Sequence, residues 1–136
     1  MNTLTPFTSP EKTVRALLRG QLAAVAGRPE AVGTSLPDVV TDLYVRISRV
    51  PGGGTRRVDG DFVLDIETFH PSYSSAESAA FAIEAIMLGY PWTVEVDPET
   101  RVVIDAVTQN QGVSETFWDD DSVHRLLATY VITMRR

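Results

Sequence analysis

The sequence has 136 residues, of which 43% are hydrophobic and 22% are charged, and its formal net charge is −6. This length and composition are typical of one soluble globular domain with an ordinary hydrophobic core. The absence of cysteine excludes disulfides, thiolate metal sites and a cysteine nucleophile, and the acidic balance argues against a dedicated nucleic-acid binder. No apolar run is long enough for a signal peptide or a bilayer span, so we expect a protein that stays soluble in a cytoplasm.

The first expected element is an amphipathic helix that begins at Ser9 and Pro10. Serine caps helices, and proline suits the first helical position because its missing N–H costs nothing there. Gly27 and Pro29 are expected to end the helix, and residues 31–38 are expected to form a loop. The buried stripe of the helix follows a three- and four-residue spacing and consists of Val14, Leu17, Leu18, Leu22 and Val25.

Two strands joined by a glycine-rich segment are expected next. Apolar and polar residues alternate over 43–48 and again over 62–67, as in strands with one buried face. The segment from Pro51 to Arg57 between them is interpreted as a loop or hairpin tip, so the two strands should pair antiparallel. The residues expected to face the core are Leu43, Val45, Ile47, Phe62, Leu64 and Ile66.

A second helix is expected to open at Ser74 and Ser75 and to stop at Gly89 and Pro91. Several positions of its apolar stripe are alanine, and such small side chains favour a close approach of the helix backbone to a sheet. The stripe consists of Ala76, Ala79, Ala80, Ile83, Ile86 and Met87.

The rest of the chain is expected to supply about three strands. Alternation predicts strands over 92–96 and 101–108, joined by a turn at 97–100. Residues 109–122 are polar and are interpreted as irregular. The last strand, over 125–134, should bury one face made of Leu126, Ala128, Tyr130, Ile132 and Met134.

These elements predict one α+β domain over residues 1–136, with residues 1–8 as a flexible N-terminal arm. The sheet should be mostly antiparallel, with about four to five strands and both helices packed on one face. The other face should be polar enough to meet water, and it carries Tyr44, Arg46, Ser48, Asp65, Glu67, Arg125, Thr129 and Thr133.

The sequence contains no recognised catalytic motif. The Gly52–Gly54 run lacks the Gly-Lys-Ser/Thr ending and the following helix of a phosphate loop. Asp119–Asp121 and His124 are possible ligands of a hard cation, but no calcium-loop pattern surrounds them, and such charge runs usually face solvent. Neither His70 nor His124 sits in a recognised hydrolase or transferase motif, so a structural or surface role is favoured over general acid–base catalysis. Trp118, next to the aspartates, is a candidate interface anchor.

The arrangement as a whole resembles the tail terminator (tail completion) proteins of long-tailed bacteriophages. The resemblance lies in the order and pattern of elements over roughly residues 10–136. Its matching stretches are the strand at 43–50, the glycine-rich segment after it, the strand at 62–69, the Ser-Ala-Glu-Ser-Ala-Ala helix at 75–80 and the closing strand at 125–135.

The resemblance implies a structural virion protein without enzymatic activity or cofactor. Such proteins form a hexameric ring that caps the tail tube, stops its elongation and presents the surface that docks to the head. The implied partners are further copies of the chain, the major tail tube protein and a head-completion or connector protein, with DNA only in transit and no membrane. The implied location is the head-proximal end of the tail, after assembly in the host cytoplasm.

Two groups of residues are expected to serve a ring. Contacts to a neighbouring subunit or to the tube are expected from Gly52, Gly53, Gly54, Arg56, Arg57 and Trp118, with the glycine-rich tip mobile until a neighbour orders it. A channel lining of mostly negative charge, which would repel DNA, is expected from Arg46, Asp65 and Glu67. The alternative is that Asp65 and Glu67 simply face solvent or pair with Arg46 on the neighbouring strand.

The sequence is also compatible with three other functions. These are a head-completion or head–tail connector adaptor, a host-derived binding module, and a small metal-dependent enzyme that uses His124 with Asp119–Asp121.

Overall fold

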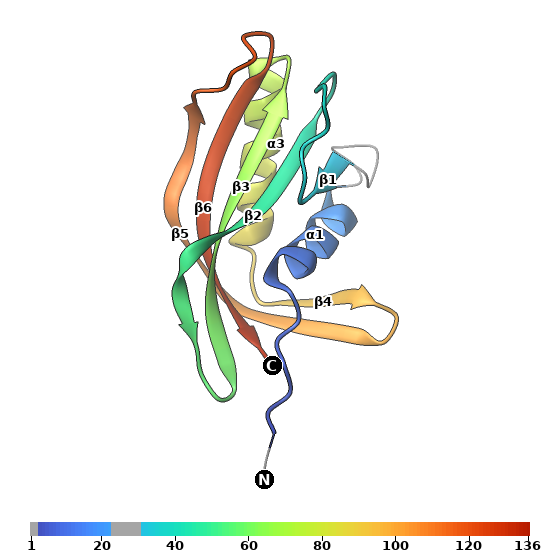
Figure 1. Cartoon of the computed structure of the whole chain (residues 1–136), viewed down its shortest axis with the longest axis vertical. Helices are drawn as coiled ribbons and strands as arrows, with labels where there is room; N and C mark the ends of the chain where they lie inside the picture. Colours follow the sequence, from blue (N-terminus) through green and yellow to red (C-terminus); the bar gives the residue numbers. More distant parts are fainter. Residues whose placement is uncertain (1–2, 23–30) are drawn as a thin grey trace.

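The computed structural model describes residues 3–22 and 31–136, and in these residues two helices pack on a curled sheet of six strands (Figure 1). The sheet order is β1-β2-β3-β6-β5-β4, with β1 parallel to β2 and the other pairs antiparallel. The helices are α1 (Pro10–Gln21) and α3 (Tyr73–Met87). The strands are β1 (Val32–Gly33), β2 (Tyr44–Thr55), β3 (Asp59–His70), β4 (Trp92–Asp97), β5 (Thr100–Thr116) and β6 (His124–Arg135).

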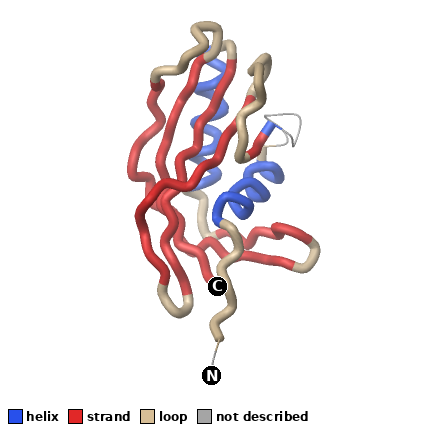
Figure 2. The backbone as a smooth tube through the Cα atoms, in the orientation of Figure 1, coloured by secondary structure: helices blue, strands red, loops and turns tan. Residues whose placement is uncertain are grey.

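Both helices pack on the same face of the sheet, as predicted. Figures 1 and 2 show α3 lying along β3 and β6, and α1 lying between β1–β2 and the β4–β5 hairpin. One core cluster joins apolar residues of α1 and α3 to the inward residues of the strands. The predicted alternation is confirmed, because Val45, Ile47, Leu64, Tyr130 and Ile132 are all fully buried. Neither described helix has the length and apolar content needed to cross a bilayer.

Helix α1 begins where its sequence predicts. The Ser9 side chain accepts a hydrogen bond from the backbone N–H of Lys12, and Pro10 occupies the first turn. Arg19 in the last turn donates two hydrogen bonds to the carbonyl of Val32, at 3.1 and 2.8 Å, which ties the helix to β1. The expected helix end at Gly27 and Pro29 lies outside the described residues.

Helix α3 begins slightly earlier than expected, with Ser72 as the capping residue in place of Ser74 or Ser75. Its alanines do face the sheet, and Ala76 and Ala79 are at most 1% exposed. After the helix, the indole N–H of Trp92 donates to the carbonyl of Ile86 at 2.8 Å and links the start of β4 to the helix end.

The predicted hairpin tip is displaced towards the C-terminus. Pro51–Gly54 belongs to β2, and the turn lies at 56–58. The register of the β2–β3 ladder shifts between Val50 and Gly54. Such a bulge accommodates the extra residues, so the glycines lie within the strand and do not form the turn. Gly53 has a φ of 74°, and a Cβ there would collide with the carbonyl of Asp61, so only glycine suits this position.

Two further differences enlarge the sheet: one adds a sixth strand to the predicted four or five, and the other lengthens a predicted strand. The short strand β1 lies in the segment 31–38 that the sequence indicates as a loop, and it makes the sheet mixed. Strand β5 continues to Thr116, through residues expected to be irregular. Three register shifts between Ile104 and Ser114 disrupt the two-residue period, and this explains why the alternation did not reveal the strand.

Candidate assembly surfaces

An ion-paired cluster forms one end of the polar sheet face. Glu67 of β3 accepts hydrogen bonds from Arg46 of β2 at 2.8 and 2.9 Å and from Arg125 of β6 at 2.6 Å. The Glu67 side chain is only 3% exposed. Burial opposes its ionisation, but the hydrogen bonds from Arg46 and Arg125 outweigh burial, and the pKa of Glu67 lies below its ordinary value. The cluster therefore holds an ionised carboxylate between three neighbouring strands.

Trp118 covers this cluster from the segment between β5 and β6. Its ring lies edge-on to Phe69, with a centroid distance of 5.0 Å. The guanidinium groups of Arg46 and Arg125 lie 6.0 and 5.7 Å from the Trp118 ring centroid, within cation–π range. Trp118, expected to be an interface anchor, is thus half-buried against its own sheet, whereas the preceding Phe117 is 83% exposed.

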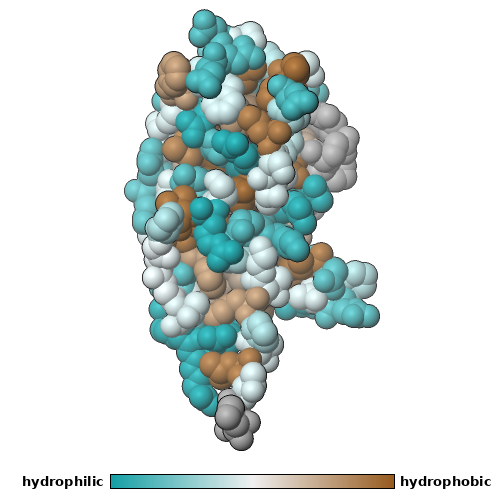
Figure 3. Space-filling view, viewed as in Figure 1, coloured by the Kyte–Doolittle hydropathy of each residue, from teal (hydrophilic) through white to brown (hydrophobic). Residues whose placement is uncertain are grey.

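The polar sheet face continues from the cluster along β3 and β6. Asp65 accepts a hydrogen bond from Thr129 at 2.6 Å, and Asp61 accepts one from Thr133 at 2.7 Å. In Figure 1 α3 lies behind the strands, and Figure 3 shows hydrophilic residues spread along the face turned to the viewer. Asp65 and Glu67 lie on the side of the sheet opposite the helices, but the two arginines that pair with Glu67 more than offset its negative charge.

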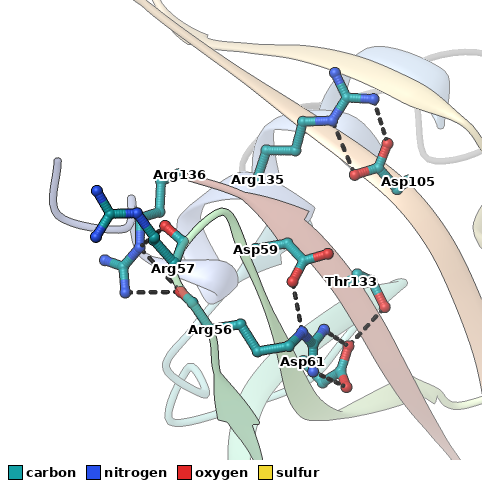
Figure 4. Close-up of polar contacts among 8 residues, drawn as sticks. All are labelled: Arg56, Arg57, Asp59, Asp61, Asp105, Thr133, Arg135 and Arg136. Atoms are coloured by element: carbon teal, nitrogen blue, oxygen red, sulfur yellow. Dashed lines mark hydrogen bonds and ion pairs between the residues drawn. The ribbon is translucent and has the colours of Figure 1, made fainter. Parts of the chain in front are cut away.

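The β2–β3 turn is held by residues of its own chain (Figure 4). The Arg56 guanidinium bonds to Asp59 at 2.6 Å and to Asp61 at 3.1 Å. Arg136 donates side-chain hydrogen bonds to the carbonyls of Arg56 and Arg57 at 2.9–3.1 Å, and its backbone N–H donates to the carbonyl of Val58 at 3.0 Å. All three turn carbonyls are therefore occupied, in contrast to the expectation of a tip that awaits a neighbour.

The N-terminal segment also packs near this turn. Phe7 lies edge-on to Phe62, with a centroid distance of 5.2 Å, and Arg136 stacks over the Phe7 ring at 4.3 Å. Arg136 also donates to the carbonyl of Thr5 at 3.2 Å. The described part of the expected arm thus lies against β3 and the end of the chain.

A groove of about 640 Å³ lies at the opposite end of the molecule, between the loop before β2 and the β5–β6 segment. Its acidic rim consists of Asp38 and Asp119–Asp121, which are all exposed. Asp120 accepts hydrogen bonds from the backbone and side chain of Ser122 and thereby shapes the loop. The apolar lining of the groove is Leu36, Pro37, Val40, Trp118 and Val123.

The histidines do not assemble the chemistry of the enzyme alternative. His124 bonds to Glu115 at 2.6 Å rather than to the aspartate run. His70 accepts at Nδ1 from the backbone N–H of Ser72, and its Nε2 lies 3.5 Å from Asp42. Within residues 3–22 and 31–136, no three His, Asp or Glu side chains are grouped to hold a metal ion.

Sequence reasoning did not identify an exposed apolar surface on the outer side of α3. Phe81, Leu88 and Tyr90 are 50%, 42% and 43% exposed. Phe81 and the capping residue Leu88 are seven residues apart, so they lie on the same side of α3. Neither residue belongs to the alanine-rich stripe from which the helix was predicted. The signal available in the sequence was that this helix carries large apolar residues on the side opposite its alanine stripe as well, which indicates a second apolar surface.

Comparison with known proteins shows a fold shared with a virion chain. No protein-family model matches the sequence, and no curated protein matches it. Among solved structures, a chain of the "Virion of native gene transfer agent (GTA) particle" superposes with a TM-score of 0.69 at 15% sequence identity. The similarity covers 94% of this chain and 96% of that one. The chain therefore has the fold of that virion component over nearly its whole length.

Proposed function

We propose that the protein is a structural component of a phage-like virion, and specifically a tail terminator. The observation that carries this proposal is the fold similarity to a virion chain, which extends over 94% of this protein and 96% of the other. A similarity of this extent favours a common role for the whole domain. The resemblance of the sequence pattern to tail terminators narrows the role to the head-proximal end of the tail.

In the proposed assembly six copies form a ring on the last layer of the tail tube. The ring prevents further addition of the major tail tube protein and presents its other side to a head-completion or connector protein. The mechanism is surface complementarity and needs no cofactor. The exposed side chains of Phe81, Leu88 and Phe117 suit such contacts, because large apolar groups left in solvent by the free chain gain most from burial by a partner.

The polar sheet face is the proposed lining of the channel through which DNA passes. Arg46, Glu67 and Arg125 neutralise one another in part, and Asp65 is hydrogen-bonded to Thr129. A lining of this kind is closer to neutral than the negative band expected from Asp65 and Glu67 alone. It lets DNA pass because paired guanidinium groups are less available to bind phosphates.

Deletion of the gene from its phage tests the proposal. Loss of a terminator should leave filled heads together with tail tubes that exceed the normal length, visible by negative-stain electron microscopy. Normal-length tails that fail to join heads would instead indicate a head-completion adaptor. Normal, infectious particles would contradict a virion role. Expression of the intact gene in trans should restore normal tails and is the control.

A further inference from the structure

The two ends of the molecule have complementary chemistry. The groove at one end combines an apolar floor with four exposed aspartates, Asp38 and Asp119–Asp121. The β2–β3 turn lies at the other end of the long axis (Figure 1). There Val58 is 68% exposed, although it is apolar, and it follows the exposed Arg57. A protruding apolar side chain beside a cation matches an apolar groove with an acidic rim.

The turn is well suited to insert into such a groove because it has a defined shape. Its three carbonyls accept hydrogen bonds from Arg136, and Arg56 is fixed by Asp59 and Asp61. An element that is ordered before binding loses less conformational entropy on association. The ion pairs at this turn are formed by Arg56 and Arg135, whereas the exposed Arg57 has no carboxylate partner among the described residues, so its charge is available to another molecule.

We propose that the β2–β3 turn of one copy docks in the acidic groove of the next copy. Val58 lies against the apolar floor near Trp118, and Arg57 pairs with Asp119 or Asp121. Four of the chain's twelve basic residues lie at or beside this turn, namely Arg56, Arg57, Arg135 and Arg136. Arg56 is paired with Asp59 and Asp61, and Arg135 with Asp105, whereas Arg57 and Arg136 have no carboxylate partner among the described residues. The chain as a whole has a net charge of −6, and the charge of Arg57 beside the exposed Val58 gives this turn a cation that can approach the four aspartates.

A contact between two different surfaces of identical chains leaves one turn and one groove unused on every dimer. Such a heterologous contact therefore repeats, and it closes into a ring when the rotation between neighbours permits. The inference deepens the proposed function and rests on it, since it supplies the contact that would build the ring. The two can fail separately, because deletion tests the role in the virion and solution assembly tests the contact.

A charge exchange in the purified full-length protein tests this contact by sedimentation velocity over a concentration series. Two variants each reverse one side of the contact: the single variant Arg57→Glu and the double variant Asp119→Arg with Asp121→Arg. Each should raise the dissociation constant at least about tenfold, because like charges then face each other. The three substitutions together should restore assembly, because the charges are complementary again. Asp120 stays unchanged, because its carboxylate holds Ser122.

Matched controls change the same charges elsewhere on the surface. The control variants are the single variant Arg101→Glu and the double variant Glu95→Arg with Glu99→Arg, which change exposed residues of the β4–β5 hairpin. Both should assemble like the wild type. Far-ultraviolet circular dichroism shows that each variant is folded. The inference is overturned by a wild type that is monomeric at all concentrations, by variants that assemble like wild type, or by a triple variant that stays dissociated.

Discussion

Glu67 is the one charged side chain that is buried among the residues described by the structure. An isolated carboxylate in this position would be strongly disfavoured, and it is stable because Arg46 and Arg125 bind both of its oxygens. The two arginines come from the strands on either side of β3. The ion cluster therefore fixes the relative register of three strands at the end of the sheet where Trp118 covers it.

Replacing Glu67 by Gln should destabilise the protein at neutral pH by on the order of 3 kcal/mol, because two arginines lose their buried partner. The pKa of Glu67 is lower in the folded protein than its ordinary value of 4.5. Its stabilising contribution is thus complete above that value and is lost as the pH falls through the folded-state pKa. Urea unfolding at several pH values should show the gap between wild type and variant narrowing below about pH 4.5.

The exposed residue Glu95 provides the control, since Glu95→Gln should change the free energy of unfolding by less than about 0.5 kcal/mol. A gap between wild type and Glu67→Gln that stays constant down to acidic pH would show that the ion cluster is not its origin.

For single residues, the sequence predicted on which face of the sheet a side chain lies better than it predicted which residues that side chain contacts. Alternation placed Arg46 and Glu67 together on the polar face, and their pairing was one of the two interpretations considered. The second partner, Arg125, is 58 residues from Glu67. Its contact depends on β6 pairing with β3, and a periodic pattern within each strand carries no information on which distant strand lies beside it.

The glycine run is the feature of β2 that decides its shape. Gly52 and Gly53 both have positive φ, and the ladder to β3 shifts register between Val50 and Gly54. The strand twists at this irregularity and continues to Thr55, which places the turn at 56–58 beyond the main sheet. The sequence analysis interpreted the glycine run as a loop or hairpin tip, because composition alone does not distinguish a bulge within a strand from a turn.

Two neighbouring glycines give a matched test of this geometry. Gly53→Ala should cost at least about 2 kcal/mol of stability, because φ is positive and the new Cβ meets the carbonyl of Asp61. Gly54→Ala adds the same atom in open space and should change stability by less than about 0.5 kcal/mol. Thermal unfolding measures both variants. Equal stability of the two variants would contradict a bulge centred on Gly53.

At the element scale, the helices and the regular strands were predictable because their burial follows a simple period. Strand β1 was not, since it has two residues and depends on pairing with β2 and on the hydrogen bonds from Arg19 to Val32. Only the tertiary structure brings those groups together. The acidic groove could not be predicted from the sequence either, because its lining combines residues 36–40 with residues 118–123, which only the folded chain brings together.

For the whole molecule, three surfaces have distinct proposed tasks. The polar sheet face lines the channel, the turn and the groove join neighbouring copies, and the outer side of α3 with Phe81 and Leu88 remains for the tube or the head. The turn and the groove lie at opposite ends of the molecule, and the groove adjoins the polar sheet face at Trp118. The proposal that they act in a particle rests on the fold that the chain shares with a virion chain.

The most direct measurement is single-particle cryo-electron microscopy of the intact phage particle at the joint of head and tail. We expect a ring of six copies on the last layer of the tail tube, with the polar sheet face turned to the channel and the helices outside. Arg46 and Asp65 should then border the channel, while Glu67 stays buried beneath its two arginines and Trp118. A particle that lacks the chain, a copy present as a monomer or dimer, or a ring with α1 and α3 lining the channel would contradict the account.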